Sequence, residues 1–261
     1  MAKQGFALIT GASKGIGKAI GIELAQKGWN LMLTARSESL LEALQAEWSQ
    51  KYNVRVEILA ADLTLDETPA KLFDFCQEKQ IPIQMLINNA GFGVWDHFED
   101  ADLKELEAMN LLNITAVLRV CHAFIPLLKT HPKAYLLNVA STGAYQPLPA
   151  MALYGAGKAY IRSFTYALRD ELRNSPISVT CLSPGGVWTE FMERTGNEIV
   201  AERASRWMMS PQQCAQAAVK GLLKGKAEVI PGWYNWVAAM SSKFGTTKMS
   251  TRIARKFFEK P

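Results

Sequence analysis

Short apolar runs alternate along the chain with longer stretches in which apolar positions recur every three to four residues. The short runs have the length of buried strands, and the longer stretches have the period of helices that bury one face. The predicted strands are Phe6–Ile9, Asn30–Thr34, Arg55–Ala60, Met85–Asn88, Ala134–Val139 and Ile177–Leu182, with Val229–Ile230 as a candidate seventh. The predicted helices lie near 15–28, 38–51, 67–79, 102–129, 151–174 and 211–224.

This alternation predicts an α/β fold, namely one Rossmann-type, doubly wound parallel sheet of about seven strands with helices on both faces. No internal repeat, low-complexity segment or linker divides residues 1–261, so we expect a single domain. In such a sheet ligands bind at the carboxyl ends of the strands. Candidate chemistry should therefore follow the strands.

A glycine-rich segment, Thr10-Gly11-Ala12-Ser13-Lys14-Gly15-Ile16-Gly17, lies between the first strand and the first helix. Glycines allow a tight turn and a close backbone approach, and the free amides of a helix N-terminus attract phosphate. The alternative is a purely structural turn. The position after strand one favours nucleotide binding, with candidate cofactor-binding residues Gly11, Ser13, Lys14, Gly15, Ile16 and Gly17.

The end of the second strand indicates which dinucleotide fits. An acidic residue there would bind the ribose hydroxyls of NAD, but this chain has Ala35 and Arg36, and its next carboxylate is Glu38. Arg36 can pair with a 2′-phosphate, and Lys14 adds a second charge. Both could instead be solvated surface cations. The pattern favours NADP(H).

Tyr154 and Lys158 form a Tyr-x3-Lys unit, and Ser141 lies thirteen residues before the tyrosine. Positions i and i+4 share one face of a helix. A phenol has a pKa of about 10, and one positive charge ~6 Å away favours phenolate by roughly 2–3 kcal/mol at a dielectric of ~20. We therefore expect Lys158 to lower the pKa of Tyr154. The alternative is a half-buried ring beside a solvated amine.

Together these motifs resemble the short-chain dehydrogenase/reductase family over about residues 5–230. The family's cofactor spacing matches Thr10 to Gly17, and further likenesses lie in Asp62-Leu63, Asn88-Asn89-Ala90-Gly91 and Pro184-Gly185-Gly186-Val187-Trp188-Thr189. The resemblance implies that Asp62 and Leu63 bind the adenine side, that Asn89, Ala90 and Gly91 line the cofactor cleft, and that Pro184, Gly185, Val187 and Thr189 reach the nicotinamide end. Each also has a structural alternative, such as a helix cap for Asp62 or an ordinary turn at Pro184.

The same resemblance implies hydride transfer between nicotinamide and a carbonyl or carbinol carbon. Ser141 would hydrogen-bond the substrate oxygen and Tyr154 would donate the proton. Lys158 would lower the tyrosine pKa and hold the nicotinamide ribose, so Tyr154 and Lys158 count as cofactor-binding too. Asn110, in Met109-Asn110-Leu111, resembles the helix asparagine that completes this catalytic set, although it could instead be a surface residue.

Composition excludes several classes of protein. Residues 230–261 contain six Lys or Arg against Glu259, which equals the whole net charge of +5, so general nucleic-acid binding is not expected. The four cysteines and three histidines show no ligand or disulfide spacing, which predicts no metal site and a reducing, cytoplasmic location. We expect neither a signal peptide nor a membrane span, because no unbroken apolar run approaches ~18 residues.

Aromatic and methionine residues suggest an apolar, adaptable substrate pocket, with core packing as the alternative. Candidate walls are Val94, Trp95, Phe98, Tyr145, Met151, Trp188, Phe191, Met192, Trp207, Met208 and Met209, and residues 190–210 are the predicted substrate loop. The predicted substrate is a small lipophilic ketone or aldehyde, or a 3-oxoacyl thioester.

Residues 231–261 form a basic, aromatic C-terminal extension that the family resemblance does not explain. A substrate lid or subunit contact is the first interpretation, and a membrane-surface helix is the second. The predicted function is NADPH-dependent carbonyl reduction by a homodimer or homotetramer. The rival is a non-catalytic NADP(H)-binding regulator or scaffold, against which the complete catalytic set argues.

Overall fold

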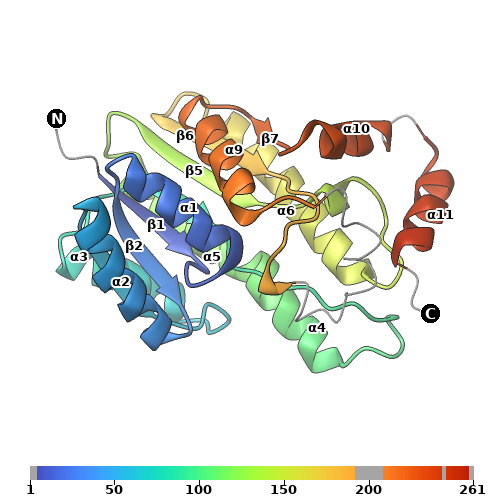
Figure 1. Cartoon of the computed structure of the whole chain (residues 1–261), viewed down its shortest axis with the longest axis horizontal. Coiled ribbons are helices and arrows are strands. Elements are labelled where there is room, and N and C mark those ends of the chain that lie inside the picture. The colour runs from blue at the N-terminus through green and yellow to red at the C-terminus, as the bar shows by residue number, and fades with distance from the viewer. Residues whose placement is uncertain (1–4, 192–207, 243–244, 259–261) are drawn as a thin grey trace.

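The computed structural model describes residues 5–191, 208–242 and 245–258. Seven parallel strands form one sheet in the order β3-β2-β1-β4-β5-β6-β7 (Figure 1). The strands are β1 (Phe6–Thr10), β2 (Asn30–Ala35), β3 (Val56–Ala60), β4 (Ile83–Asn88), β5 (Ala134–Val139), β6 (Ile177–Leu182) and β7 (Glu228–Val229). The predicted fold class is confirmed, and each predicted strand overlaps an observed one.

Helices cover both faces of the sheet. The helices of the described residues are α1 (Gly15–Gln26), α2 (Glu38–Tyr52), α3 (Thr68–Glu78), α4 (Leu103–Asn110), the π-helical turn η1 (Leu111–Thr115), α5 (Ala116–Leu128), the 3₁₀ turn η2 (Thr142–Tyr145), α6 (Ala152–Glu171), α9 (Pro211–Leu223), α10 (Trp233–Ser241) and α11 (Thr247–Phe258). Buried side chains of α1, α2 and α9 form one hydrophobic core, and those of α3, α5 and α6 form the other.

The central strands are buried on both faces, which explains their unbroken apolar sequence. In β1, Ala7 and Ile9 belong to the first core, whereas Phe6 and Leu8 belong to the second. The strand order reverses between β1 and β4, and the loops that leave the carboxyl ends of these strands diverge there. Such a switch point is where open α/β sheets bind ligands.

The continuous helical segment Leu103–Leu128 is long and apolar enough to cross a membrane by length and composition, with 39% of its most apolar window buried. The sequence predicted no such segment, because the criterion was an unbroken apolar run and polar residues interrupt this helix. Within this segment α5 packs Val120, Cys121 and Phe124 into the second core, and Arg119 pairs with Asp66 at 2.7 Å. Packing on the sheet explains the apolar residues that are buried, and length and composition alone are weak evidence for a membrane span.

All four cysteines are free and buried. Burial raises the pKa of each thiol to about 12, for Cys76, Cys121, Cys181 and Cys214 alike. Within the described ranges no cluster of His, Cys, Asp or Glu has the arrangement of a metal site. The thiols therefore act as small apolar groups of the core.

The C-terminal helices α10 and α11 were not predicted from periodicity and lie at the end of the molecule opposite the N-terminus (Figure 1). The Ser242 hydroxyl, at the end of α10, donates to the Tyr145 carbonyl at 3.4 Å, and the Trp95 indole donates to the Phe258 carbonyl of α11 at 2.8 Å. The extension is thus packed onto the domain. Residues 192–207, which are most of the predicted substrate loop, lie outside the described residues. So do several residues named for the tail and the loop: Met192, Trp207, Lys243, Glu259 and Lys260.

Candidate active site

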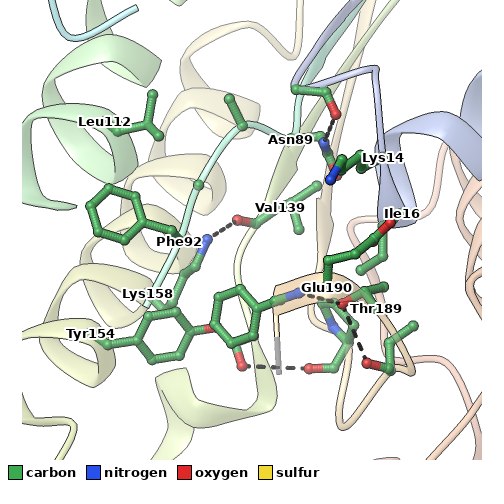
Figure 2. Close-up of a pocket in the computed structure, with 18 of the residues that line it drawn as sticks. Lys14, Ile16, Asn89, Phe92, Leu112, Val139, Tyr154, Lys158, Thr189 and Glu190 are labelled. Carbon is green, nitrogen blue, oxygen red and sulfur yellow. Dashed lines mark hydrogen bonds between the residues drawn. The ribbon is translucent and has the colours of Figure 1, made fainter. Parts of the chain in front are cut away.

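A cleft of about 1350 Å³ runs across the carboxyl ends of the strands. It is lined by almost all the predicted site residues: Gly11, Ser13, Lys14, Gly15, Ile16, Arg36, Asp62, Leu63, Asn89, Ala90, Gly91, Ser141, Tyr154, Lys158, Pro184, Gly185, Val187 and Thr189. Figure 2 shows Tyr154 and Lys158 at one side of this cleft, with Lys14 and Ile16 at the other. Gly17 and Asn110 are the two predicted residues outside the lining.

Side-chain hydrogen bonds hold the glycine-rich turn after β1 against the end of β4. The Asn89 amide donates to the carbonyls of Thr10 and Gly11 at 2.9 and 3.1 Å, and the Thr10 hydroxyl accepts from the backbone N–H groups of Asn89 and Ala90. Gly11 has a φ of +64°, and a Cβ on buried Gly17 would collide with the Asn89 amide and the Gly11 carbonyl. The turn is therefore a preformed site of the kind that binds a pyrophosphate. Gly17 contributes to it because its lack of a side chain lets the helix pack closely against the turn.

The adenine side of the cleft combines two exposed cations with one carboxylate. Lys14 and Arg36 both line it. Burial acts to raise the pKa of Asp62, but hydrogen bonds from the Thr64 backbone N–H and hydroxyl, together with the Arg36 charge, outweigh it and lower that pKa. Asp62 is thus a fixed anion held by Thr64, while Arg36 presents a charge to the cleft.

The catalytic candidates converge from β5 and α6. Ser141 follows β5, where its Oγ accepts from the Gly143 N–H at 3.0 Å. Lys158 is buried, donates from Nζ to the Val139 carbonyl at 2.9 Å, and lies 5.8 Å from the centre of the Tyr154 ring (Figure 2). The structure therefore brings together Ser141, Tyr154 and Lys158 as the sequence predicted.

The predicted lowering of the Tyr154 pKa by Lys158 is wrong for this structure. Burial raises the pKa of the Tyr154 phenol, and a hydrogen bond with Ser141 opposes this only in part. Burial also lowers the pKa of Lys158, to about 8. Desolvation disfavours the charged form of each group, because both are removed from water. At neutral pH Tyr154 is consequently a protonated phenol, which suits a proton donor.

Asn110 does not join this cluster, and its prediction is corrected. It ends α4 with an exposed side chain. Asn113, inside the π-helical turn, is buried, accepts from the Phe92 N–H at 3.1 Å and donates to the Phe92 carbonyl at 2.8 Å. A Cβ built on Gly91 would lie 2.8 Å from Asn113 Oδ1 and 3.6 Å from Lys158 Nζ. Asn113 thus occupies the place expected of Asn110.

The sequence offered one signal for Asn113. It lies between Leu112 and Ile114, where a buried amide would need partners, but Asn110 lies between Met109 and Leu111 in the same kind of setting. The α-helical period gave no means of choosing between the two residues, because it does not foresee a π turn.

An ion-pair network behind the catalytic candidates was also missed. Glu228 of β7 binds Arg162 of α6 through two bonds at 3.0 and 3.1 Å. The same carboxylate accepts from the hydroxyls of Tyr145, Tyr166 and Ser183 at 2.7–2.8 Å. Burial acts to raise the pKa of Glu228, but these hydrogen bonds outweigh it and lower that pKa. The network joins α6, the turn after Ser141 and the strand end before Pro184.

The substrate end is lined differently from the prediction. Of the predicted walls, Met151, Phe191 and Met208 line the cleft, and the Phe191 ring lies 5.7 Å from that of Tyr154. Trp95 is buried against α11, and Phe98 is 68% exposed. Several apolar lining residues were missed, among them Leu148, Phe257 and Phe258. The two phenylalanines belong to α11, so the C-terminal extension forms part of the cleft.

The loop after β6 is closed at its base by backbone pairing. Val187 and Met209 form a parallel bridge, with Trp188 N–H donating to Met209 and Met209 N–H donating to Gly186. Asn235 of α10 is buried so tightly against Gly185 that a Cβ on the glycine would collide with its amide. Helix α10 therefore supports the Pro184-Gly185 segment from behind.

The chain belongs to the short-chain dehydrogenase family, whose family model matches residues 5–199. It is accordingly an oxidoreductase that acts on CH–OH or C=O groups with a nicotinamide cofactor.

Particular relatives differ in their named substrates. Sulfoacetaldehyde reductase 2 of Chromohalobacter salexigens is 35% identical over 81% of this chain and 84% of its own length. Human 17-beta-hydroxysteroid dehydrogenase type 3 is 30% identical over 87% of this chain and 76% of its own. A short-chain dehydrogenase from Sphingobium yanoikuyae, solved in complex with NADPH, superposes with a TM-score of 0.82 and 30% identity, covering 92% and 94% of the two chains.

Proposed function

We propose that this protein is an NADPH-dependent carbonyl reductase. The observation that carries the proposal is the convergence of Ser141, Tyr154 and Lys158 in a cleft whose adenine side presents Lys14 and Arg36. The preformed glycine turn fits a dinucleotide pyrophosphate, and the two cations fit the extra phosphate of NADP(H). The relative from Sphingobium yanoikuyae, with its NADPH, supports the same choice.

When bound, the nicotinamide supplies the hydride. Ser141 Oγ hydrogen-bonds the substrate oxygen, and the protonated Tyr154 phenol donates a proton to that oxygen. Lys158, charged below a pKa of about 8, is suited to hold the nicotinamide ribose and to stabilise the phenolate that Tyr154 becomes. Asn113 positions the Gly91–Phe92 backbone beside that lysine. Proton donation of this kind contributes about 10²–10⁴-fold to the rate.

We propose a lipophilic ketone, aldehyde or 3-oxoacyl thioester as the substrate. The support is the set of apolar side chains around Tyr154, namely Leu148, Met151, Phe191, Met208, Phe257 and Phe258. A steroid dehydrogenase among the relatives is consistent with a lipophilic substrate, whereas the sulfoacetaldehyde reductase is named for a small charged one. The apolar lining decides our choice, because an anionic group such as a sulfonate is bound best by charged hydrogen-bond donors, and the residues around Tyr154 are mostly apolar.

The direct test follows NADPH oxidation with ketones, aldehydes and 3-oxoacyl thioesters of graded chain length. We expect kcat/KM to rise with apolar chain length, by up to about tenfold for each 1.4 kcal/mol of apolar burial. Equal rates on polar and apolar carbonyls would contradict the substrate proposal. A lower KM for NADH than for NADPH would contradict the cofactor proposal.

The non-catalytic alternative is tested by Tyr154→Phe. We expect the variant to lose reductase activity by at least about 10²-fold, because no proton donor remains, while NADPH fluorescence titration stays unchanged. Tyr160→Phe is the matched control, since Tyr160 lies on the same helix and the residue is 43% exposed. Wild-type protein that binds NADPH yet reduces no carbonyl would favour the regulator or scaffold.

A further inference from the structure

Helix α11 presents three distinct faces. Ser250, Ala254 and Phe258 face the domain. One position before each of these, Met249, Ile253 and Phe257 form an exposed apolar stripe at 53%, 52% and 46% exposure. The cations Lys248, Arg252, Arg255 and Lys256 lie beside that stripe. A helix that packs one narrow face inward and leaves a second, apolar face exposed is suited to contact a further surface.

The preceding helix extends the exposed apolar area at the same end of the molecule. In α10, Trp233 is 77% exposed, Trp236 is 54% exposed and Val237 is 47% exposed. Helices α10 and α11 follow each other around this end of the domain (Figure 1). Tryptophan and cationic side chains are the residues that anchor helices at a membrane interface.

The exposed stripe continues into the cleft. Phe257 belongs to the stripe and also lines the cleft, together with Phe258. Ala254 packs in a cluster with Trp95 and Met151, and Tyr154 packs against the same cluster. An apolar molecule that enters the cleft at Phe257 therefore contacts apolar side chains along its way to Tyr154.

Charge decides what occupies this face. Helix α11 has no acidic residue, and none of Lys248, Arg252 and Arg255 forms an ion pair with another described residue. A second copy paired through α11 about a two-fold axis would place these cations against each other. Nucleic acid would satisfy the cations but leave the apolar stripe exposed. An anionic lipid surface satisfies both.

We propose that α10 and α11 dock this enzyme on anionic lipid surfaces, with the mouth of the substrate cleft facing the lipid. The lipid surface supplies the lipophilic substrate directly to the cleft. Only this delivery of substrate rests on the proposed function; the docking itself does not. The apolar stripe enters the boundary between headgroups and acyl chains, while the cations stay with the headgroups.

Vesicle flotation of the full chain tests the docking without any substrate. We expect binding to phosphatidylcholine vesicles that contain 30% phosphatidylglycerol, ~30% being the anionic fraction chosen to give a strongly negative surface. Much weaker binding is expected to pure phosphatidylcholine, and loss of binding in high salt. Arg252→Gln with Arg255→Gln should lower the partition coefficient by about 10–30-fold, since each cation near the surface adds roughly fivefold. The matched control, Lys220→Gln with Lys224→Gln, removes two exposed cations at the C-terminal end of α9 and should leave binding unchanged.

A second variant tests the apolar stripe. Met249→Ser with Ile253→Ser should lower vesicle binding by at least about tenfold, with unchanged circular dichroism and unchanged NADPH affinity. Binding to anionic vesicles that neither double variant weakens would overturn the proposal, as would no vesicle binding by the wild type. A change in oligomeric state of the apolar variant, measured by light scattering, would assign the face to a second copy and also overturn it. Vesicle binding is measured without substrate. A protein that reduces no carbonyl would therefore contradict the proposed function without affecting the test of docking.

Discussion

The two ends of the cleft are built in different ways. At the cofactor end, backbone groups from one short turn are held by Thr10 and Asn89 against the central strands. At the substrate end, side chains from η2, α6, the loop after β6 and α11 meet although they lie far apart in the chain. The first construction depends on glycine and a fixed turn, whereas the second depends on which long side chains meet.

This difference separates cofactor binding, which the family shares, from substrate choice, which differs between its members. A backbone cradle binds any dinucleotide with the right phosphates, because amide groups are the same in every sequence. A side-chain wall can change residue by residue without disturbing the sheet. The named substrates of the relatives, a sulfoaldehyde and a steroid, are consistent with such a division. Four changes test it, taken here from the largest expected effect to the smallest.

Removing Glu228 should disturb the catalytic end most strongly. Glu228→Ala leaves Arg162 without its carboxylate and three hydroxyls without their acceptor, so we expect a loss of about 3 kcal/mol in the free energy of unfolding in urea. The control is Asp170→Ala, which breaks the exposed Arg173–Asp170 ion pair at the end of α6. It should lower the free energy of unfolding by less than about 1 kcal/mol. Similar losses for the two variants would show that the network contributes little.

Asn113→Ala should lower kcat by about 100-fold, while Asn110→Ala should leave it within about twofold. The first change leaves the Phe92 N–H and carbonyl unpaired in a buried site, which costs about 1–3 kcal/mol, and removes the support of the backbone beside Lys158. Steady-state kinetics, with NADPH titration as the binding control, would separate positioning from general unfolding. A larger effect at Asn110 would restore the prediction made from the sequence.

At the cofactor end, Arg36→Gln should raise the KM for NADPH by about tenfold and leave the KM for NADH unchanged. The lost interaction is a charge-assisted hydrogen bond to a phosphate, reduced here by solvent because Arg36 is exposed. Lys18→Gln, which removes an exposed cation of α1 outside the cleft lining, is the control. An equal effect on both cofactors would place Arg36 away from the 2′-phosphate.

Over a single pH unit, the smallest effect is the gradual one with pH. Because the pKa of Lys158 is about 8, its charge is present below that pH and is lost above it. The kcat/KM for ketone reduction should therefore fall by at most about tenfold per pH unit above about pH 8, as the active protonation state is depleted. Tyr154 stays protonated over this range because burial raises its pKa. A flat profile up to pH 10 would contradict the assigned role of Lys158.

The sequence predicted the elements whose signals are local. The strands, the glycine turn and the Tyr154–Lys158 pair each depend on neighbours within one strand or one helical turn, and the structure has all of them. It could not separate Asn113 from Asn110, because a π turn changes the helical register. It missed the Glu228 network and the two phenylalanines of α11, because these contacts join segments far apart in the chain. The sign of the Tyr154 pKa shift depends on burial, which spacing alone does not reveal.

The four buried thiols have a practical consequence. A cysteine reacts as its thiolate, so thiols buried with pKa values of about 12 resist alkylation and oxidation in the folded protein. A fifth cysteine placed on the surface would then be the reactive one, with no need to delete the native four. Thr247→Cys, at the exposed start of α11, would accept a polarity-sensitive fluorophore. Its emission would report, in real time, what that helix touches.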